Sequence, residues 1–289
     1  MKRYSFLAVL VFLVAQGAWS DQPLVGDYAG DVGDGGIAFL SNSMMDFAVE
    51  ANGYSEVPIP YRLEQIGALT FLRWGKDFER QDLILISQKL CFVFRSEKRM
   101  EMEGILFEKS NKPSVNRRVI GESALMRAAD QYAATSELKD GGTVYSASNL
   151  GNALPGKAWA VRTRNSGIGE TVRTYWTIGS ASEITAQSGF PRKIGALVFS
   201  NGYVSYDRPD LYLKNNRVRA LRISSDDGKY DFAVNIPDTP NPLVIPLPKD
   251  SAEVTIEIRD VYKGTKWNDT CVNFIKGVSK PLADFLSSS

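Results

Sequence analysis

The sequence AEVTIEIRDVYKGTKWNDTCVNFI, residues 252–275, alternates apolar and polar side chains before a polar connection. Val254, Ile256 and Ile258 fall on one face of an extended chain, and a second apolar run ends at residue 275. A period of two is typical of a β-strand that buries one face. The stretch therefore predicts two core strands joined by residues 264–270, a connection that exposes Trp267 beside two short polar side chains.

Similar short runs occupy the second half of the chain, residues 135–282, and turn residues separate them. They include VYSASN, KAWAVR, TVRTYWTI, KIGALVFSNGY and RVRALRISS. Many short strands without intervening helices are typical of an antiparallel sandwich or jelly roll. The pattern therefore predicts an all-β fold with a β-sandwich jelly roll in this half.

The first half, residues 21–110, also has the texture of antiparallel β structure. The runs GALTFLRW, DLILISQKLCFVFR and MEGILFEKS alternate with charged turns, and a meander of this kind buries one face. We expect a small antiparallel β domain, either a barrel or a curved sheet. Between the two domains, residues 111–134 are interpreted as a linker with a short helix that begins near Ser123, and residues 283–289 as a tail.

The N-terminus has the features of a secretory signal. Lys2 and Arg3 precede an apolar run at residues 6–15, and AWS at residues 18–20 supplies small side chains for a signal peptidase. The run is too short to span a bilayer comfortably. We therefore predict a signal peptide over residues 1–20, export to the periplasm or beyond the cell, and no transmembrane anchor after cleavage.

Composition excludes several classes of site. Lysine and arginine number 34 against 33 aspartates and glutamates, so no global field favours nucleic acid. Histidine is absent, which excludes a Ser-His-Asp or Cys-His site and a His-ligated zinc centre. Cys91 and Cys271 are the only thiols and lie in apolar runs, so burial is favoured over a disulfide.

Four ordered blocks carry a family resemblance: YSASNLGNALPGKAWAVRTRNSGIGE, IGALVFSNGY, KNNRVRALRI and VTIEIRDVYKGTKWNDTCVNFI. They resemble the discoidin-like F5/8 type C domain known as the NADase-type glycan-binding or NAD glycohydrolase translocation domain, over residues 135–282. The resemblance implies a galactose-binding-like jelly roll whose loops at one end face a glycan. It does not imply NAD cleavage, because the catalytic machinery of the namesake toxin is a separate domain.

Two details of the resemblance concern metal and charge. Family members commonly show a Leu-Leu-Asp-Gly-Asp-like turn where this chain has LGNAL at residues 150–154, so a carboxylate is lost. Discoidin-like folds often carry a structural calcium, and Asp207, Asp210, Asp226 and Asp227 lie near turns, but no EF-hand spacing is present. The sequence leaves a metal undecided and predicts no other cofactor.

Sugar recognition requires amides, carboxylates or guanidinium groups for the hydroxyls and an aromatic ring for the apolar sugar face. The loops of the second half supply both kinds of group. The candidate glycan-binding residues are Asn149, Asn152, Trp159, Arg162, Asn201, Tyr203, Asn215, Arg217, Trp267, Asn268 and Asp269.

Each candidate also has a structural interpretation. The asparagines at 149, 152 and 201 suit turns, Trp159 lies in an alternating run typical of a core, and Arg217 alternates on a strand whose charged face is expected in water. Asn268 and Asp269 can pin the connection rather than contact sugar.

We therefore expect an exported, non-catalytic protein whose jelly roll binds a glycan or glycoconjugate through its end loops. The alternative is an envelope scaffold or protein-interaction module that uses the N-terminal β domain to bind an envelope protein. Hydrolysis by paired glutamates is a third possibility, but nothing in the sequence marks two of them as facing each other.

Overall fold

The computed structural model describes residues 26–30, 36–40, 43–49, 53–54, 58–87, 89–107, 126–162, 164–176 and 193–287. The predicted signal peptide, residues 1–20, lies outside these ranges. Among the described residues, no helix has both the length and the apolar character that a membrane span requires.

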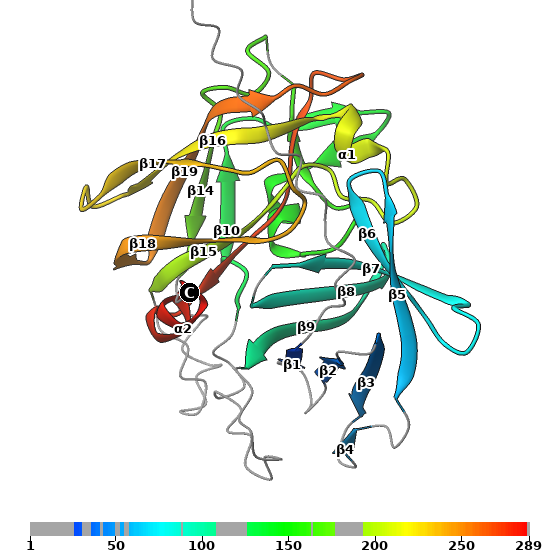
Figure 1. Cartoon of the computed structure of the whole chain (residues 1–289). Coiled ribbons are helices and arrows are strands. Elements are labelled where there is room, and N and C mark those ends of the chain that lie inside the picture. The colour runs from blue at the N-terminus through cyan, green and yellow to red at the C-terminus, as the bar shows by residue number, and fades with distance from the viewer. Residues whose placement is uncertain are drawn as a thin grey trace, which may run out of the picture.

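The first half forms one antiparallel sheet that closes on itself (Figure 1). Its strands are β1 (Gly26–Gly30), β2 (Gly36–Phe39), β3 (Met44–Val49), β5 (Ile59–Ile66), β6 (Leu69–Trp74), β7 (Arg80–Ile86), β8 (Leu90–Ser96) and β9 (Arg99–Phe107), with the short β4 (Gly53–Tyr54) on β3. Each strand pairs with the next, and β9 returns to pair with β1. The predicted antiparallel β domain is confirmed. Of its two expected forms, a barrel and a curved sheet, the structure has the closed one.

Strand β8 shows why parts of this half read as continuous apolar runs. Successive side chains on a strand point to opposite faces. Cys91 and Val93 lie inside the closed sheet with Trp74, whereas Phe92 and Phe94 belong to an apolar cluster on its outer face. Both faces of the strand are buried, so the alternation of polar and apolar residues disappears.

The second half is the predicted sandwich, built mainly from a nine-stranded sheet in the order β10-β14-β19-β16-β20-β15-β18, with β13 on β20 and β17 on β16. Its strands are β10 (Gln131–Ala134), β13 (Trp159–Val161), β14 (Thr171–Tyr175), β15 (Ile194–Asn201), β16 (Asn216–Ser225), β17 (Asp231–Asn235), β18 (Leu243–Ser251), β19 (Glu253–Tyr262) and β20 (Thr270–Val278). The smaller elements are the hairpin β11 (Leu138–Asp140) and β12 (Thr143–Tyr145), the 3₁₀ helix η1 (Ala147–Gly151), α1 (Leu211–Lys214) and α2 (Lys280–Ser287).

The two strands predicted from residues 252–275 are β19 and β20. They flank β16, which pairs antiparallel with β19 along its length and parallel with β20 at Asn216 and Arg217. Val254, Ile256 and Ile258 are buried in the sandwich core as their alternation predicts.

The structure differs from the prediction at both edges of this half. Most of the predicted linker and the predicted helix start near Ser123 lie outside the described residues. Residues 126–134 contain no helix; Arg127 instead forms an antiparallel bridge with Gly277, and β10 already begins at Gln131. Pairing with the sheet overrides local helix propensity here. At the other edge the expected tail contributes to α2, because Leu282, Ala283 and Leu286 bury one helix face.

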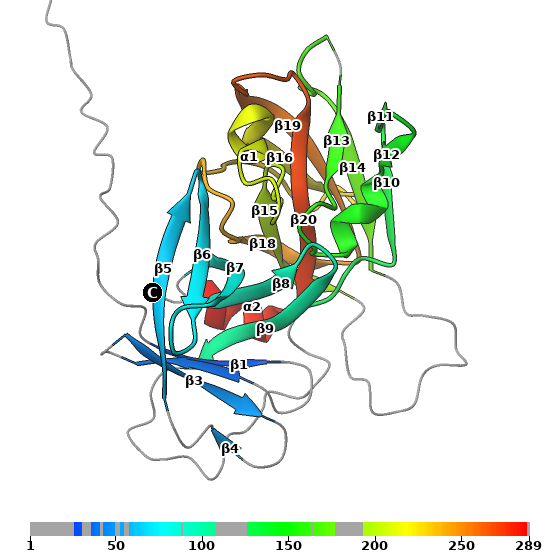
Figure 2. The ribbon, with the colours of Figure 1, turned by 90° about the vertical axis from the view of Figure 1, so that its right-hand side faces the viewer.

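The closed sheet lies beside β20 and α2 of the second half (Figure 2), and the two halves share an apolar cluster. Phe92 of the closed sheet packs against Phe274 of β20, with 5.0 Å between ring centroids. Tyr206 places its ring edge-on to Phe71, and its hydroxyl donates to the Gln81 carbonyl at 2.7 Å. The closed sheet and the sandwich are therefore packed together as one unit.

Candidate functional site

Several connections lie at one end of the sandwich, at the opposite end of β20 from α2 (Figure 2). They are residues 162–170 after β13, residues 202–215 before β16, residues 236–242 after β17 and residues 263–269 before β20. The closed sheet lies mainly toward the other end of the sandwich, although its β5–β6 turn reaches Pro209.

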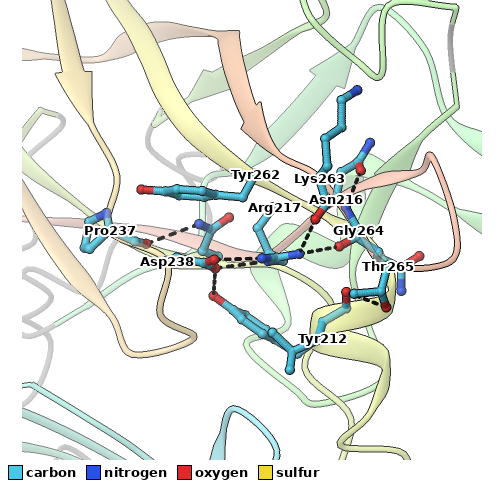
Figure 3. Close-up of polar contacts among 12 residues, drawn as sticks. Tyr212, Asn216, Arg217, Pro237, Asp238, Tyr262, Lys263, Gly264 and Thr265 are labelled. Atoms are coloured by element: carbon cyan, nitrogen blue, oxygen red, sulfur yellow. Dashed lines mark hydrogen bonds and ion pairs between the residues drawn. The ribbon is translucent and has the colours of Figure 1, made fainter. Parts of the chain in front are cut away.

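Arg217 joins these connections from beneath (Figure 3). Its side chain is 6% exposed. Nε donates to Oδ1 of Asp238 at 3.0 Å and Nη2 to Oδ2 at 2.7 Å. Nη1 donates to the carbonyls of Asn215 at 2.9 Å and Lys263 at 3.1 Å, and the guanidinium lies 5.5 Å from the centre of the Tyr212 ring.

The expected solvent-facing position of Arg217 is therefore wrong. The end connections cover this end of β16. The alternation of charged and apolar residues, which predicts a solvent-exposed face, therefore does not apply there. With its donors directed to protein oxygens, the side chain holds loops in place rather than offering a group to a ligand.

Asn216 fixes residues 263–269 from the same strand. Its Oδ1 accepts from the Gly264 amide at 2.7 Å, its Nδ2 donates to Oδ1 of Asn268 at 3.1 Å, and its own amide donates to the Asp269 carbonyl at 2.8 Å. A Cβ on Gly264 would lie 2.4 Å from the carbonyl oxygen of Lys214. The close backbone approach therefore requires glycine.

Ser166 completes the support of Asn268 from the β13–β14 connection. Its hydroxyl donates to Oδ1 of Asn268 at 2.7 Å, and it also bonds to the Lys263 ammonium. The Ser166 carbonyl accepts from the Thr270 hydroxyl at 2.5 Å. Ser166 has a left-handed φ of 58°, a conformation that non-glycine residues adopt at a cost and that concentrates at functional sites.

Arg162 and Asp269 form a two-bond ion pair at the same end. Nε and Nη2 lie 2.5 and 2.9 Å from the two carboxylate oxygens. Asp269 is buried, whereas 49% of the Arg162 side chain is exposed. The hydrogen bond and charge of Asp269 raise the pKa of Arg162 above its ordinary value. The Asp269 carboxylate is thus already bound by Arg162, and the outer part of the Arg162 guanidinium faces solvent.

Trp267 is partly exposed and lies among lysines. Its amide donates to the Lys214 carbonyl at 2.9 Å. The ammonium groups of Lys266 and Lys214 are 4.8 and 5.9 Å from the ring centre, within the range of cation–π attraction. We call the solvent-facing residues of this end the end-loop rim: Arg162, Lys214, Lys263, Lys266, Trp267 and Asn268.

Three further candidates form a neighbouring group. Asn149 donates through Nδ2 to the Ala158 carbonyl at 3.0 Å, and Asn152 is exposed at the end of η1. Tyr203 packs edge-on against Tyr145, and its hydroxyl donates to the Gly156 carbonyl at 3.3 Å. Burial, followed by the charge of Asp140, raises the pKa of Tyr145. Tyr145 and Tyr203 both pack against the cluster that contains Cys271, two residues after Asp269.

The remaining candidates are buried and present little surface to a ligand. Trp159 is 1% exposed in the sandwich core, and its Nε1 donates to the Ser136 carbonyl. Asn201 is 1% exposed and exchanges two hydrogen bonds with the Val218 backbone, at 2.8 and 2.9 Å. Asn215 is 7% exposed and caps α1 by donating to the Leu211 carbonyl.

Four rim or support residues were missed in the sequence: Ser166, Lys214, Lys263 and Lys266. Lysines that flank a tryptophan in a short connection were an available signal for Lys263 and Lys266. Nothing local marked Ser166 or Lys214, because their roles arise from contacts with distant residues.

Three of the four aspartates considered for calcium form ion pairs in the structure. Asp226 pairs with Arg173, Asp227 with Lys229, and Asp210 with Arg208 and Lys214. Among the described residues, no cluster of three acidic, cysteine or histidine side chains is placed to hold a metal. A cavity of about 270 Å³ at the opposite end of the sandwich is lined by Lys193, Asp226, Asp227, Asp250, Ser251, Ala252 and Glu253, and it contains no such cluster.

Comparison with known proteins places this half in a family. Residues 126–276, just over half of the chain, match the family model described as the NAD glycohydrolase translocation F5/8 type C domain. The resemblance inferred from the four sequence blocks is confirmed. No curated protein matches the chain.

Several solved structures are similar to part of the chain, at low identity and low TM-score. The arabinofuranosyltransferase AftD from Mycobacteria is 17% identical with a TM-score of 0.33, over 50% of this chain and 10% of that one. The family 32 CBM of C. perfringens NanJ, solved in complex with galactose, is 12% identical with a TM-score of 0.32, over 53% and 98%. CpGH89CBM32-4 from Clostridium perfringens, solved in complex with GlcNAc-alpha-1,4-galactose, is 11% identical with a TM-score of 0.33, over 53% and 91%.

Proposed function

The chain belongs to the NAD glycohydrolase translocation F5/8 type C domain family, and from this premise we propose that it is an exported, non-catalytic protein that binds a glycan at the end-loop rim. The signal-like N-terminus supports export. The rim supports binding, because it combines fixed polar groups with an exposed aromatic ring.

One observation carries the proposal: Asn268 is exposed yet held in one orientation. Its Oδ1 accepts hydrogen bonds from both Ser166 and Asn216. Its Nδ2 donates to no other described residue, so the amide is available to a ligand in a fixed direction. Trp267 precedes it and supplies an aromatic surface of the kind that covers the C–H face of a sugar.

The rim is open rather than enclosed, which predicts weak binding. A hydrogen bond to a neutral group contributes about 0.5–1.5 kcal/mol net. A few such bonds and one ring contact correspond to dissociation constants of about micromolar to millimolar. Because the supporting contacts already fix Asn268 and Arg162, little ordering entropy opposes binding.

The carboxylates near the rim argue against glycoside hydrolysis. A glycosidase needs one carboxylic acid with a raised pKa beside a second carboxylate. Asp269 and Asp238 instead form two-bond pairs with Arg162 and Arg217. Hydrogen bonds from Arg208 and Lys214 lower the pKa of Asp210. Asp269 and Asp238 are thus engaged by guanidinium groups and the lowered pKa of Asp210 disfavours its protonated form, so none of the three is suited to protonate a leaving group.

The alternative, a scaffold that uses the first domain, must use another of its surfaces. The outer faces of β6, β7 and β8 are packed against the sandwich through Leu69, Phe71, Leu83 and Phe92. We propose that the closed sheet supports the sandwich rather than acting as the main binding surface.

The test is glycan binding by the full mature chain, residues 21–289, first on a glycan array and then by calorimetry. Asn268→Ala and Trp267→Ala are expected to weaken binding at least about tenfold, the equivalent of about 1.4 kcal/mol. Asn235→Ala is the matched control, because Asn235 is exposed on β17. Absence of binding to every glycan, or equal binding by all three variants, would overturn the proposal.

A further inference from the structure

Positive charge is concentrated in the two connections that form most of the rim. Residues 162–170 and 263–269 contain Arg162, Arg164, Lys263 and Lys266 but only two acidic residues, Glu170 and Asp269. The whole chain, by contrast, has a formal net charge of +1. The excess of cations belongs to these two connections. The other two at the same end, residues 202–215 and 236–242, add the cations Arg208 and Lys214 and the acidic residues Asp207, Asp210 and Asp238.

The two acidic side chains are already occupied. Asp269 is buried in its pair with Arg162, and Glu170 accepts hydrogen bonds from the hydroxyls of Thr135 and Ser136. Neither forms an ion pair with a lysine in the described part of the chain. Among the described residues neither Lys263 nor Lys266 forms an ion pair, although the charge of Lys263 helps to lower the pKa of Asp260, which pairs with Arg219.

The lysines surround the groups proposed to hold the sugar. Lys266 and Lys214 approach the Trp267 ring from 4.8 and 5.9 Å. Lys263 bonds to Ser166, which in turn donates to Asn268. A saccharide that lies on the ring and bonds to the Asn268 amide therefore has ammonium groups within reach of its substituents.

We infer that the saccharide bound at the end-loop rim is acidic and carries a carboxylate or a sulfate group. This inference rests on the proposed function and specifies its ligand class. The ammonium groups of Lys263 and Lys266 beside a fixed amide fit an anionic substituent next to hydroxyls. The attraction between one exposed pair of charges changes affinity by up to about fivefold, so Lys263 and Lys266 together give about tenfold or more.

An anionic lipid surface is a different partner that the same charges would attract. The observations favour a saccharide, because Ser166 and Asn216 hold the Asn268 amide in one direction. A lipid surface bound by charge and apolar insertion has no need of such a fixed donor. Vesicles that contain anionic lipid belong in the test as a competing outcome.

The experiment compares matched neutral and acidic sugars on the full mature chain. Oligomers of galactose and galacturonic acid differ by the carboxylate, and sulfated and unsulfated forms of one oligosaccharide test the second anion. We expect the acidic member to bind about tenfold tighter and the preference to decline as salt is added.

The decisive variant is the double substitution Lys263→Gln and Lys266→Gln. It is expected to bring the ratio of acidic to neutral affinity close to one, and this ratio is the readout because both lysines border the neutral site as well. Lys229→Gln is the matched control, because this exposed lysine lies in the β16–β17 turn and pairs with Asp227; it should leave the preference intact.

The outcomes separate the two claims. Equal binding of neutral and acidic sugars, insensitive to salt, overturns the acidic ligand and leaves the proposed glycan binding standing. Absence of binding to both kinds overturns the proposed function. Binding to anionic-lipid vesicles without binding to any acidic sugar overturns the inference in favour of a membrane surface.

Discussion

Arg217 and Asp238 are joined by two parallel hydrogen bonds, 3.0 and 2.7 Å long, beneath the end loops of the sandwich. The same guanidinium donates to the Asn215 and Lys263 carbonyls. One buried side chain thus connects the segments before β16, after β17 and before β20. The rim depends on this connection although Arg217 does not reach the rim.

Removal of Arg217 should destabilise the fold. Arg217→Met removes the cation paired with Asp238, which keeps only the Tyr212 hydroxyl as a donor, and it removes a donor from two carbonyls. We expect the free energy of unfolding to fall by about 2–4 kcal/mol. Urea unfolding monitored by circular dichroism measures it. Arg219→Met is the control, because 56% of that side chain is exposed and it pairs only with Asp260; a change below about 1 kcal/mol is expected. Equal losses in the two variants would contradict the role assigned to Arg217.

Gly264→Ala should displace the rim. The new Cβ would lie 2.4 Å from the Lys214 carbonyl, and this overpacking is expected to cost about 1–3 kcal/mol. The Lys266 and Trp267 amides, which both donate to that carbonyl, should exchange hydrogen for deuterium faster. Thr265→Ala, at an exposed neighbour, serves as the control. Unchanged exchange in Gly264→Ala would show that the loop tolerates the Cβ.

Local patterns predicted the strands but not the burial of polar residues. Residues 252–275 predicted β19 and β20, because successive side chains of a pleated strand point to opposite faces and therefore alternate between apolar and polar. The positions of Arg217 and Asn201 depend on distant partners: Asn201 on β15 bonds to Val218 on β16, two strands that β20 separates. No window of sequence around either residue contains that information.

The two tryptophans show the same limit within the candidate site. Trp159 and Trp267 both satisfied the chemical requirement for a sugar platform, yet Trp159 is fully in the core and Trp267 is partly exposed. Alternation around residue 159 favoured a core position, which the structure shows. Lys214 lies far from residue 267 in sequence, so its place at the ring depended on how α1 packs beneath the last connection.

The shared core predicts that the two halves unfold together. Phe92→Ala removes the contact with Phe274, and a loss of about 3–5 kcal/mol is expected. Calorimetry of the full chain should show one transition that moves as a whole. Leu63→Ala, at an exposed position on β5, should leave it nearly unchanged. Two separate transitions, of which only one responds to Phe92→Ala, would show that the halves are independent.

Both thiols should be unreactive in the folded protein. Cys91 and Cys271 are free and buried, and burial raises the pKa of each thiol, so little thiolate is present at neutral pH. A thiol-specific reagent followed by mass spectrometry should label neither cysteine in the native chain and both after denaturation. If neither cysteine is labelled in the denatured chain without reductant, the two cysteines form a disulfide.

Alkaline pH should weaken the fold, in part through Tyr132. Its hydroxyl donates to the Ile275 carbonyl at 2.6 Å and accepts from the Ala129 amide at 2.9 Å. Burial raises the pKa of Tyr132 from 10.0 to about 12. The unfolded chain therefore loses the Tyr132 proton at a lower pH than the folded protein does. The stabilisation that Tyr132 contributes is complete below the ordinary tyrosine pKa, and it is lost as the pH rises toward the pKa of Tyr132 in the folded protein.

Tyr132→Phe tests this dependence. The variant should lose about 1 kcal/mol at neutral pH because the Ile275 carbonyl loses its donor, and its free energy of unfolding should fall less steeply with pH above the ordinary tyrosine pKa. Some decline remains, because burial also raises the pKa of Tyr28, Tyr203 and Tyr212. Urea unfolding at a series of alkaline pH values measures both slopes. Parallel slopes for the variant and the native chain would mean that Tyr132 ionises equally readily in the folded and unfolded states.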